Sequence, residues 1–284
     1  MKQLQNRRQF LAVAAASVTG AGVALDRPAR AAAYGAGKRT PKERFQLGLA
    51  SYTLRKFNLD DTLAMTKRVG LKYIAFKDFH LALDSSPEKI RSVVRKVKDA
   101  GLELYGGGVI YMRTEQQVRQ AFAYAKAAGM KVIIGVPKPN LLPLVDKMVK
   151  QYDIKVAIHN HGPGDKDYPV PATAYERIKD LDERIGLCND IGHTMRAGVD
   201  PSASIVKYAD RLYDMHIKDV SAATAKGHGV EIGRGVIDIP AVLRSLIQID
   251  YSGIVSFEYE KDAEDPMPGL AESVGYVRGV LAAL

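Results

Sequence analysis

From Phe45 onward, short β-rich runs alternate with amphipathic helical stretches, and this unit recurs eight times. Several of the β-rich runs are almost entirely apolar, as is typical of parallel strands that are buried on both faces. An alternation of strand and helix favours a parallel sheet, and eight such units within about 240 residues favour closure of that sheet. The sequence therefore predicts an α/β protein built as a single (β/α)₈ TIM barrel. The expected strands span residues 46–53, 73–77, 103–110, 131–136, 155–160, 185–190, 212–217 and 253–258.

The helical stretches carry start and stop signals. Residues 86–100 open on Ser-Pro-Glu, a capping residue followed by proline at the first helical position, and end before Gly101. Residues 114–128 open on the capping pattern Thr-Glu-Gln-Gln and end before Gly129. A competing doubly wound sheet would require a glycine-rich turn after its first strand, and Leu49-Ala50-Ser51-Tyr52 supplies none. These signals favour the barrel.

The beginning of the chain has the pattern of an export signal. An arginine pair, Arg7-Arg8, precedes an uncharged, alanine-rich run from Leu11 to Leu25. This run is shorter than the roughly 20 apolar residues that span a bilayer, so it is typical of a signal peptide, and an uncleaved anchor is the alternative. Twin arginines resemble the Tat signal, which exports folded proteins. We therefore expect a signal peptide at residues 1–31, a short linker at 32–44, the barrel at 45–284, and an exported or periplasmic protein.

The composition limits the partners. Hydrophobic residues make up 46% of the chain and charged residues 26%, which is ordinary for a globular protein with a full core. The net charge of +9 is carried partly by the leader, and no basic stripe is present, so a nucleic acid is not expected as a partner. The one cysteine, Cys188, cannot form an internal disulfide. Stable membrane insertion is not expected after cleavage, and assembly into a homo-oligomer is left open.

Polar side chains gather where the last four predicted strands end. In a βα barrel, these ends form the active-site face. The four strand ends read His159-Asn160-His161, Asn189-Asp190, His216-Ile217-Lys218 and Phe257-Glu258. A single histidine or carboxylate at such a position is commonly structural, but four converging strand ends indicate a metal site, because buried polar groups are costly to leave unpaired. The residue types suit one divalent ion such as Mn²⁺, Zn²⁺, Co²⁺ or Mg²⁺.

Four segments resemble the sugar isomerase/epimerase group of xylose-isomerase-like barrels, which is related to the ketose 3-epimerases and to the AP endonuclease 2 superfamily. The segments are NDIGH at 189–193, HIKD at 216–219, GRGVID at 233–238 and VSFE at 255–258, and the resemblance covers about residues 42–284. It implies that strands five to eight supply a Glu, an Asp, a His and a Glu to one metal. Carried over by position, Asp190, His216 and Glu258 are three of these ligands, and His193 is a contact to a substrate oxygen.

The chain departs from this resemblance at strand five, where His159 stands in place of the family's glutamate. His159 can still bind a metal, and His161, which shares its face of the strand, could replace or assist it. The epimerases use their two metal-bound glutamates as opposed acid and base, and only Glu258 remains here. We take Glu258 as the first candidate for the base, with His159 or His193 as its partner, since histidine has an unperturbed pKa near 6.5.

Further residues are expected to contact the substrate. Lys77 follows the second strand, Lys218 the seventh, and Glu231 and Arg234 lie in the loop after the seventh. His161 belongs to the same group. Solvated lysines and a rim salt bridge are the structural alternatives. Gly106-Gly107-Gly108 is expected to follow the third strand and to permit close approach of the backbone.

The expected chemistry is removal of a proton next to the carbonyl of an unphosphorylated sugar, with the metal polarising that carbonyl. Reprotonation at the neighbouring carbon would make the protein an isomerase, and reprotonation at the same carbon an epimerase. Expulsion of a β-leaving group would make it a lyase or hydratase of 3-keto sugars or glycosides, which the missing strand-five glutamate favours. A non-catalytic, exported sugar-binding barrel is a third hypothesis. An AP endonuclease would require more ligands and a basic groove, which the sequence lacks.

Overall fold

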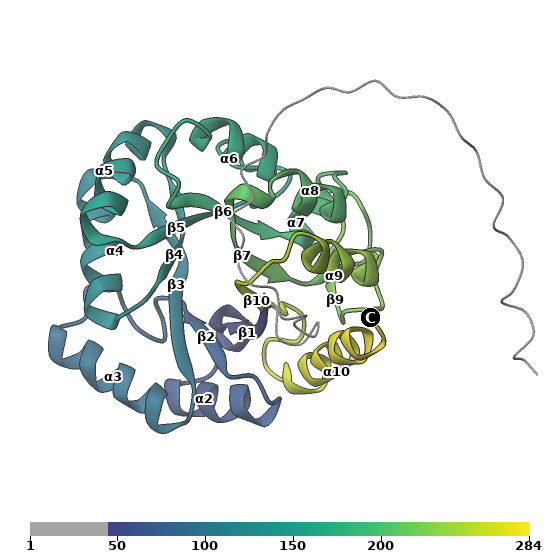
Figure 1. The fold of residues 1–284 in the computed structure, drawn as a ribbon. Helices are drawn as coiled ribbons and strands as arrows, with labels where there is room; N and C mark the ends of the chain where they lie inside the picture. The colour runs from purple at the N-terminus through teal and green to yellow at the C-terminus, as the bar shows by residue number, and fades with distance from the viewer. Residues whose placement is uncertain (1–44) are drawn as a thin grey trace, which may run out of the picture. The chain divides into compact units, whose positions relative to one another are not determined.

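The computed structural model describes residues 45–284. In this part of the chain, parallel strands close into a barrel in the order β1-β10-β7-β6-β5-β4-β3-β2, and helices surround the barrel (Figure 1). The prediction of a single (β/α)₈ barrel is confirmed. The predicted signal peptide at residues 1–31 and the linker at 32–44 lie outside the described residues. The barrel strands are β1 (Gln46–Ala50), β2 (Tyr73–Phe76), β3 (Glu103–Met112), β4 (Val132–Pro137), β5 (Lys155–His159), β6 (Ile185–Asp190), β7 (Leu212–Ile217) and β10 (Ile254–Phe257).

Helices connect the strands and cover the outside of the barrel (Figure 1). They are α2 (Leu59–Arg68), α3 (Pro87–Asp99), α4 (Glu115–Ala128), α5 (Leu142–Tyr152), α6 (Pro171–Ile178), α7 (Ile191–Arg196), α8 (Pro201–Lys207), α9 (Ile239–Gln248) and α10 (Met267–Ala283). A small antiparallel ribbon of β8 (Asp219–Val220) and β9 (Gly229–Val230) follows β7. Within residues 45–284, no helix combines the length and the apolar character that crossing a membrane requires.

The predicted helix signals act as expected. Ser86 caps α3 by accepting a hydrogen bond from the backbone N–H of Lys89 at 3.3 Å, and Thr114 caps α4 in the same way from Gln117 at 3.2 Å. Helix α4 ends at Gly129, whose φ of 69° lies in the left-handed region that glycine adopts without steric cost. The expectation that the apolar runs form buried strands also holds for β4, because all six of its residues are buried.

Two strands, β1 and β3, differ from their predicted bounds by more than one residue at an end. Strand β1 stops at Ala50, because residues Ser51–Leu54 turn into a 3₁₀ helix at the mouth of the barrel. Strand β3 continues to Met112, so Gly106, Gly107 and Gly108 lie inside it and not after it. A Cβ atom on Gly108 would lie 2.3 Å from the carbonyl oxygen of Ile134 on β4. The glycines therefore allow β3 to lie close to β4, and the expectation that they follow the strand was wrong.

Candidate metal and substrate site

Four side chains converge at the C-terminal mouth of the barrel, from four strands that are neighbours in the ring. His159 ends β5, Asp190 ends β6, His216 lies in β7, and Glu258 directly follows β10. All four are buried, and one potential ligand atom from each lies within 4.8 Å of the other three. The structure thus brings together the four residues that the sequence singled out as metal ligands.

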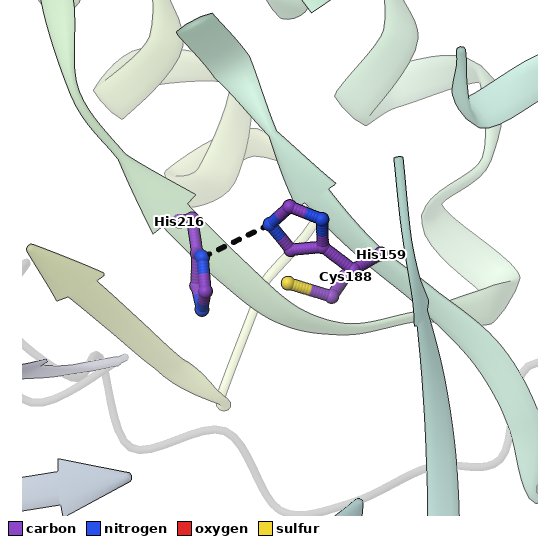
Figure 2. A group of neighbouring side chains, drawn as sticks. All are labelled: His159, Cys188 and His216. Carbon is purple, nitrogen blue, oxygen red and sulfur yellow. Dashed lines mark hydrogen bonds between the residues drawn. The ribbon is translucent and has the colours of Figure 1, made fainter. Parts of the chain in front are cut away.

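The shortest contacts in this cluster join its nitrogen and oxygen atoms directly. His159 Nε2 lies 3.1 Å from His216 Nδ1, the contact drawn as a dashed line in Figure 2, and 3.3 Å from Asp190 Oδ2. His216 Nδ1 lies 3.1 Å from Glu258 Oε2. The same nitrogen of His216 therefore faces one imidazole and one carboxylate. A single hydrogen on this nitrogen can form a hydrogen bond with only one of them.

Asp190 is held in place by the helix that follows it. Its Oδ1 accepts a hydrogen bond from the backbone N–H of His193 at 2.8 Å and so caps α7. Its own backbone N–H donates to Asn160 Oδ1 at 3.0 Å, and the Asn160 amide donates to Thr194 at 3.1 Å. These bonds fix the carboxylate so that its second oxygen, Oδ2, faces the cluster.

His216 is supported from below by a buried network inside the barrel. Its Nε2 lies 3.7 Å from Asp214 Oδ2, and Asp214 accepts hydrogen bonds from Tyr105 at 3.2 Å and from Cys188 at 3.2 Å. Tyr105 comes from β3, which is not a neighbour of β7 in the ring, so its side chain crosses the barrel interior. Cys188 lies beside His159 and His216 (Figure 2), in a group that could also ligate a metal.

Sequence reasoning missed Asp214 and Tyr105 and gave Cys188 only a packing role. A signal for Asp214 was present, because it precedes His216 by two residues and alternate residues of a strand share a face. Tyr105 had no comparable signal, since its contact with Asp214 joins positions 109 residues apart.

Burial and charge set the protonation of the cluster. Burial lowers the pKa of His159 to about 3, so its ring is neutral. Burial alone would also lower the pKa of His216, but Glu258 and Asp214 outweigh it and raise the value to about 8. For Glu258, burial would raise the pKa, yet His216 and Lys218 hold it well below its usual value. The carboxylate is therefore ionised and His159 neutral, which are the forms that bind metal ions.

The hydrogen bonds of the cluster are incomplete. Among residues 45–284, His159 Nδ1, His216 Nε2 and Asp190 Oδ2 are buried atoms without a hydrogen-bond partner of good geometry. Lys218 supplies positive charge here: its Nζ lies 2.9 Å from Asp190 Oδ2 and 2.6 Å from Glu258 Oε2, and it also contacts Glu260. Two imidazoles and two carboxylates form a mixed donor set of the kind that holds one divalent ion, so these residues fit a metal.

A cavity of about 320 Å³ opens beside this cluster. Three of the predicted substrate contacts, Lys77, His161 and His193, line it together with the cluster residues His159 and Glu258. The remaining lining side chains are Tyr52, Val109, Tyr111 and Glu260. The pocket therefore combines neutral rings, charged groups and hydroxyls, as a site for a polyhydroxylated ligand requires.

The side chains on the rim of this cavity are linked in small groups. His161 Nε2 lies 3.0 Å from the Tyr111 hydroxyl, the two rings are stacked, and His161 Nδ1 lies 3.4 Å from Asp165. Lys77 donates to the carbonyl of Val109, and burial lowers the pKa of the Lys77 ammonium. Neither Tyr111 nor Asp165 was selected from the sequence, because neither belongs to a strand-end cluster.

The other predicted substrate contacts lie elsewhere. Arg234 is exposed and pairs with Glu272 of α10 at 2.5 Å, and Glu231 accepts from Tyr259 at 3.0 Å and from Lys261 at 2.8 Å. Neither lines the cavity, because both side chains are engaged with α10 or with the segment after β10. Lys218 lies among the cluster carboxylates and not on the cavity wall.

A closed parallel barrel with a buried His/Asp/Glu cluster at its C-terminal mouth defines a class: βα barrels whose site is able to hold one divalent metal ion. Within that class, the chain belongs to the xylose isomerase-like TIM barrel family, whose model matches residues 63–280.

Two curated proteins are similar to parts of this chain. The rhizopine catabolism protein MocC of Rhizobium meliloti is 27% identical over 158 residues, or 48% of this chain and 46% of that protein. The inosose dehydratase of Geobacillus kaustophilus is 28% identical over 124 residues, or 38% of this chain and 39% of that protein. The chain thus spans less than half the length of these relatives.

Solved structures match more of the chain. The IolI protein, whose crystal structure has a bound zinc atom, is 18% identical with a TM-score of 0.71, and the match covers 84% of this chain and 99% of that one. The 3-keto-D-glucoside 4-epimerase YcjR of E. coli is 17% identical with a TM-score of 0.69, and the match covers 83% and 99%. At these identities the likeness establishes the fold. A dehydratase and an epimerase are thus among the proteins to which this chain is similar.

Proposed function

We propose that this protein is a divalent-metal-dependent enzyme of the sugar isomerase/epimerase type, which removes a proton next to the carbonyl of an unphosphorylated sugar. The observation that carries the proposal is the buried set of His159, Asp190, His216 and Glu258 beside a polar cavity. The zinc atom bound by the structurally similar IolI protein supports a metal of this kind. Held by these four side chains, a divalent ion would supply Lewis acidity to the substrate carbonyl.

Glu258 is the base that the site supports best. It lines the cavity, and His216 and Lys218 keep its carboxylate ionised although it is only 6% exposed. An ionised carboxylate within a largely desolvated pocket accepts a proton without first losing one of its own. Lys77, whose pKa is lowered by burial, lines the same cavity and is available to contact a substrate oxygen.

His193 serves the reaction as a donor. Arg196 Nη1 lies 3.3 Å from His193 Nδ1, and a guanidinium group can only donate. His193 Nδ1 therefore accepts this bond, and the ring carries its hydrogen on Nε2. A ring in this tautomer donates to a substrate oxygen, which favours the role of substrate contact over that of a second base.

β-Elimination is the second candidate function, and the histidines at the end of β5 favour it. Elimination needs one base for the proton next to the carbonyl and one acid that protonates the departing oxygen on the β-carbon. Glu258 would be the base, and the Tyr111 hydroxyl, hydrogen-bonded to His161, would be the acid. The products are an enone and water, or an alcohol from a glycoside. One of the similar curated proteins is an inosose dehydratase.

The unphosphorylated substrate rests on the leader sequence. Because residues 1–31 have the pattern of a Tat signal, we propose that the protein works outside the cytoplasm, where phosphorylated sugars are scarce. Fractionation of cells that express the tagged full chain tests this: recovery in the cytoplasm alone would contradict it.

Proton NMR in D₂O tests the reaction. The full chain, loaded with zinc or manganese to one ion per chain, is incubated with a panel of free sugars and their 3-keto derivatives. Deuterium next to the carbonyl, absent with Glu258→Gln, is the expected result, and the product separates isomerase or epimerase from lyase. A metal-loaded protein that binds a sugar without any exchange would contradict the proposal and favour a non-catalytic binding barrel.

A further inference from the structure

A second cavity adjoins the substrate pocket. It has a volume of about 430 Å³, and its polar lining consists of His193, Arg196, Lys218, His228, Glu260 and Lys261. His193 and Glu260 line both cavities, so the two cavities are neighbours. A ligand that binds in the first cavity and contacts His193 therefore lies next to the second.

Most charges on the wall of this second cavity are already neutralised. Lys218 contacts Glu260 and two cluster carboxylates, as described above. Lys261 pairs with Glu231 at 2.8 Å. The two lysines therefore do not require an anion from a ligand to balance their charge.

Arg196 is different, because no carboxylate among residues 45–284 lies within ion-pair distance of it. One guanidinium nitrogen donates to His193 Nδ1 at 3.3 Å and another to the carbonyl of Ala225 at 2.9 Å. Its Nε is buried and has no hydrogen-bond partner in the described part of the chain. The wall thus carries a half-buried, permanent positive charge that no carboxylate of residues 45–284 neutralises.

The chemistry of this group selects its ligand. A half-buried charge without a counter-ion is costly, and a guanidinium presents its donors in a planar fork that matches a carboxylate or a phosphate. His193 and Arg196 lie one turn apart on α7, so they share a side of that helix. A ligand that contacts His193 through its ring oxygens would therefore bring a neighbouring anionic group to Arg196.

We propose that the second cavity is a subsite for an anionic group, a carboxylate or a phosphate, and that Arg196 is its main contact. The substrate class is then an acidic sugar, or a glycoside whose second unit carries the acid. This inference rests on the proposed function in placing a sugar ring in the first cavity. A carboxylate agrees with the unphosphorylated substrate proposed above, whereas a phosphate would overturn that part of the proposed function. The His228 ring on the exposed rim adds a second group able to donate to the anion.

Isothermal titration of the zinc-loaded full chain with D-glucuronate, D-glucose 6-phosphate and D-glucose tests the subsite. We expect at least one anionic probe to bind about tenfold more tightly than glucose, as one charge-assisted hydrogen bond would give. Whichever probe has the advantage identifies the carboxylate or the phosphate as the group. Arg196→Gln should abolish the advantage, and Arg196→Lys, which keeps the charge without the fork, should retain part of it.

Lys226→Gln is the matched control. It removes one positive charge from the β8–β9 loop, next to the Ala225 carbonyl that Arg196 contacts. Lys226 is exposed and does not line the cavity, so the advantage should persist. Equal loss in Lys226→Gln and Arg196→Gln, or no preference for either anion in the unaltered protein at any affinity, would overturn the subsite. Melting temperatures confirm that the variants are folded. If Arg196→Gln does not fold, Arg196→Lys still tests the subsite.

The deuterium experiment separates this inference from the proposed function. An anion preference without any exchange would support the subsite and overturn the enzyme. Exchange into neutral sugars without an anion preference would support the enzyme and overturn the subsite.

Discussion

The two sides of the barrel mouth hold their polar side chains with different firmness. On the side of β5, β6, β7 and β10, here called the firm side, the four cluster residues are buried, with ligand atoms within 4.8 Å of one another. On the side of β1 to β3, here called the adjustable side, Tyr52 and Lys77 are only half-buried, and Tyr111 is 42% exposed. A metal requires donors at fixed distances, whereas a sugar can be met by side chains that adjust. The comparison leads us to expect that changes on the side of β1 to β3 alter substrate choice without altering metal binding.

The largest effect is expected from Asp190→Asn, which breaks the firm side. The amide oxygen can still cap α7, but the negative charge beside the two histidines is lost, so metal affinity should fall by more than about 100-fold. Competition with a chelator of known affinity measures this. The control is Lys77→Met on the opposite side, which should leave the metal affinity almost unchanged. A similar loss in both variants would show that the two sides are not independent.

The stability of the metal-free protein is expected to depend on pH, because of a residue on the firm side. The pKa of buried His216 is raised to about 8 in the fold, above the unfolded value near 6.5. A raised pKa gives stability that is complete below pH 6.5 and lost as the pH rises through 8, here about 2 kcal/mol. Thermal unfolding in EDTA between pH 6 and 9 should show this loss.

Two variants test whether His216 causes this loss of stability with rising pH, which appears as a slope of the melting temperature against pH. His216→Asn should remove it, while His228→Asn, which changes an exposed histidine on the second cavity, should leave it unchanged. A slope that survives His216→Asn would contradict the assignment.

A smaller effect is expected from Asp214→Asn, which weakens the support below His216. Loss of the carboxylate 3.7 Å from His216 Nε2 should lower metal affinity about tenfold and change the visible spectrum of bound Co²⁺. Ser256→Ala is the control, because within residues 45–284 the Ser256 hydroxyl bonds Tyr105 but forms no hydrogen bond with the His216 ring. An unchanged Co²⁺ spectrum in Asp214→Asn would restrict Asp214 to a packing role.

The smallest effect on metal binding is expected from Tyr111→Phe on the adjustable side. The variant removes the hydroxyl bonded to His161 but keeps the stacked ring, so metal affinity should stay constant. For an eliminating substrate, kcat should fall about 100-fold, as loss of a general acid would give. Tyr124→Phe, which removes a buried hydroxyl remote from the cavity, controls for the loss of a tyrosine hydroxyl. Equal kcat values in the two variants would exclude Tyr111 as the acid.

Sequence periodicity was sufficient for the fold and for the firm side of the site. Strands β6 and β7 have the predicted bounds, and the four cluster residues lie at predicted strand ends. The family resemblance was needed to select Asp190, His216 and Glu258 among the polar residues there. The adjustable side was less predictable, because Tyr111 lies just beyond the predicted end of β3 at residue 110. The contact of Tyr105 with Asp214 crosses the barrel, and the contact of Arg196 with the Ala225 carbonyl joins a helix to a distant loop. No local pattern encodes such contacts.

The two oxygens of Asp190 belong to different tasks, since one caps α7 and the other faces the cluster. Natural selection therefore acts on this position twice, once for the folding of a helix and once for chemistry. If Asp190 were invariant across relatives, the helix cap would account for part of that invariance, so invariance would be weak evidence for a role in chemistry. A lineage that lost the metal would still be expected to keep Asp, Asn, Ser or Thr here. Degenerate descendants of this barrel are thus better detected at His159 and His216, which have no such second duty.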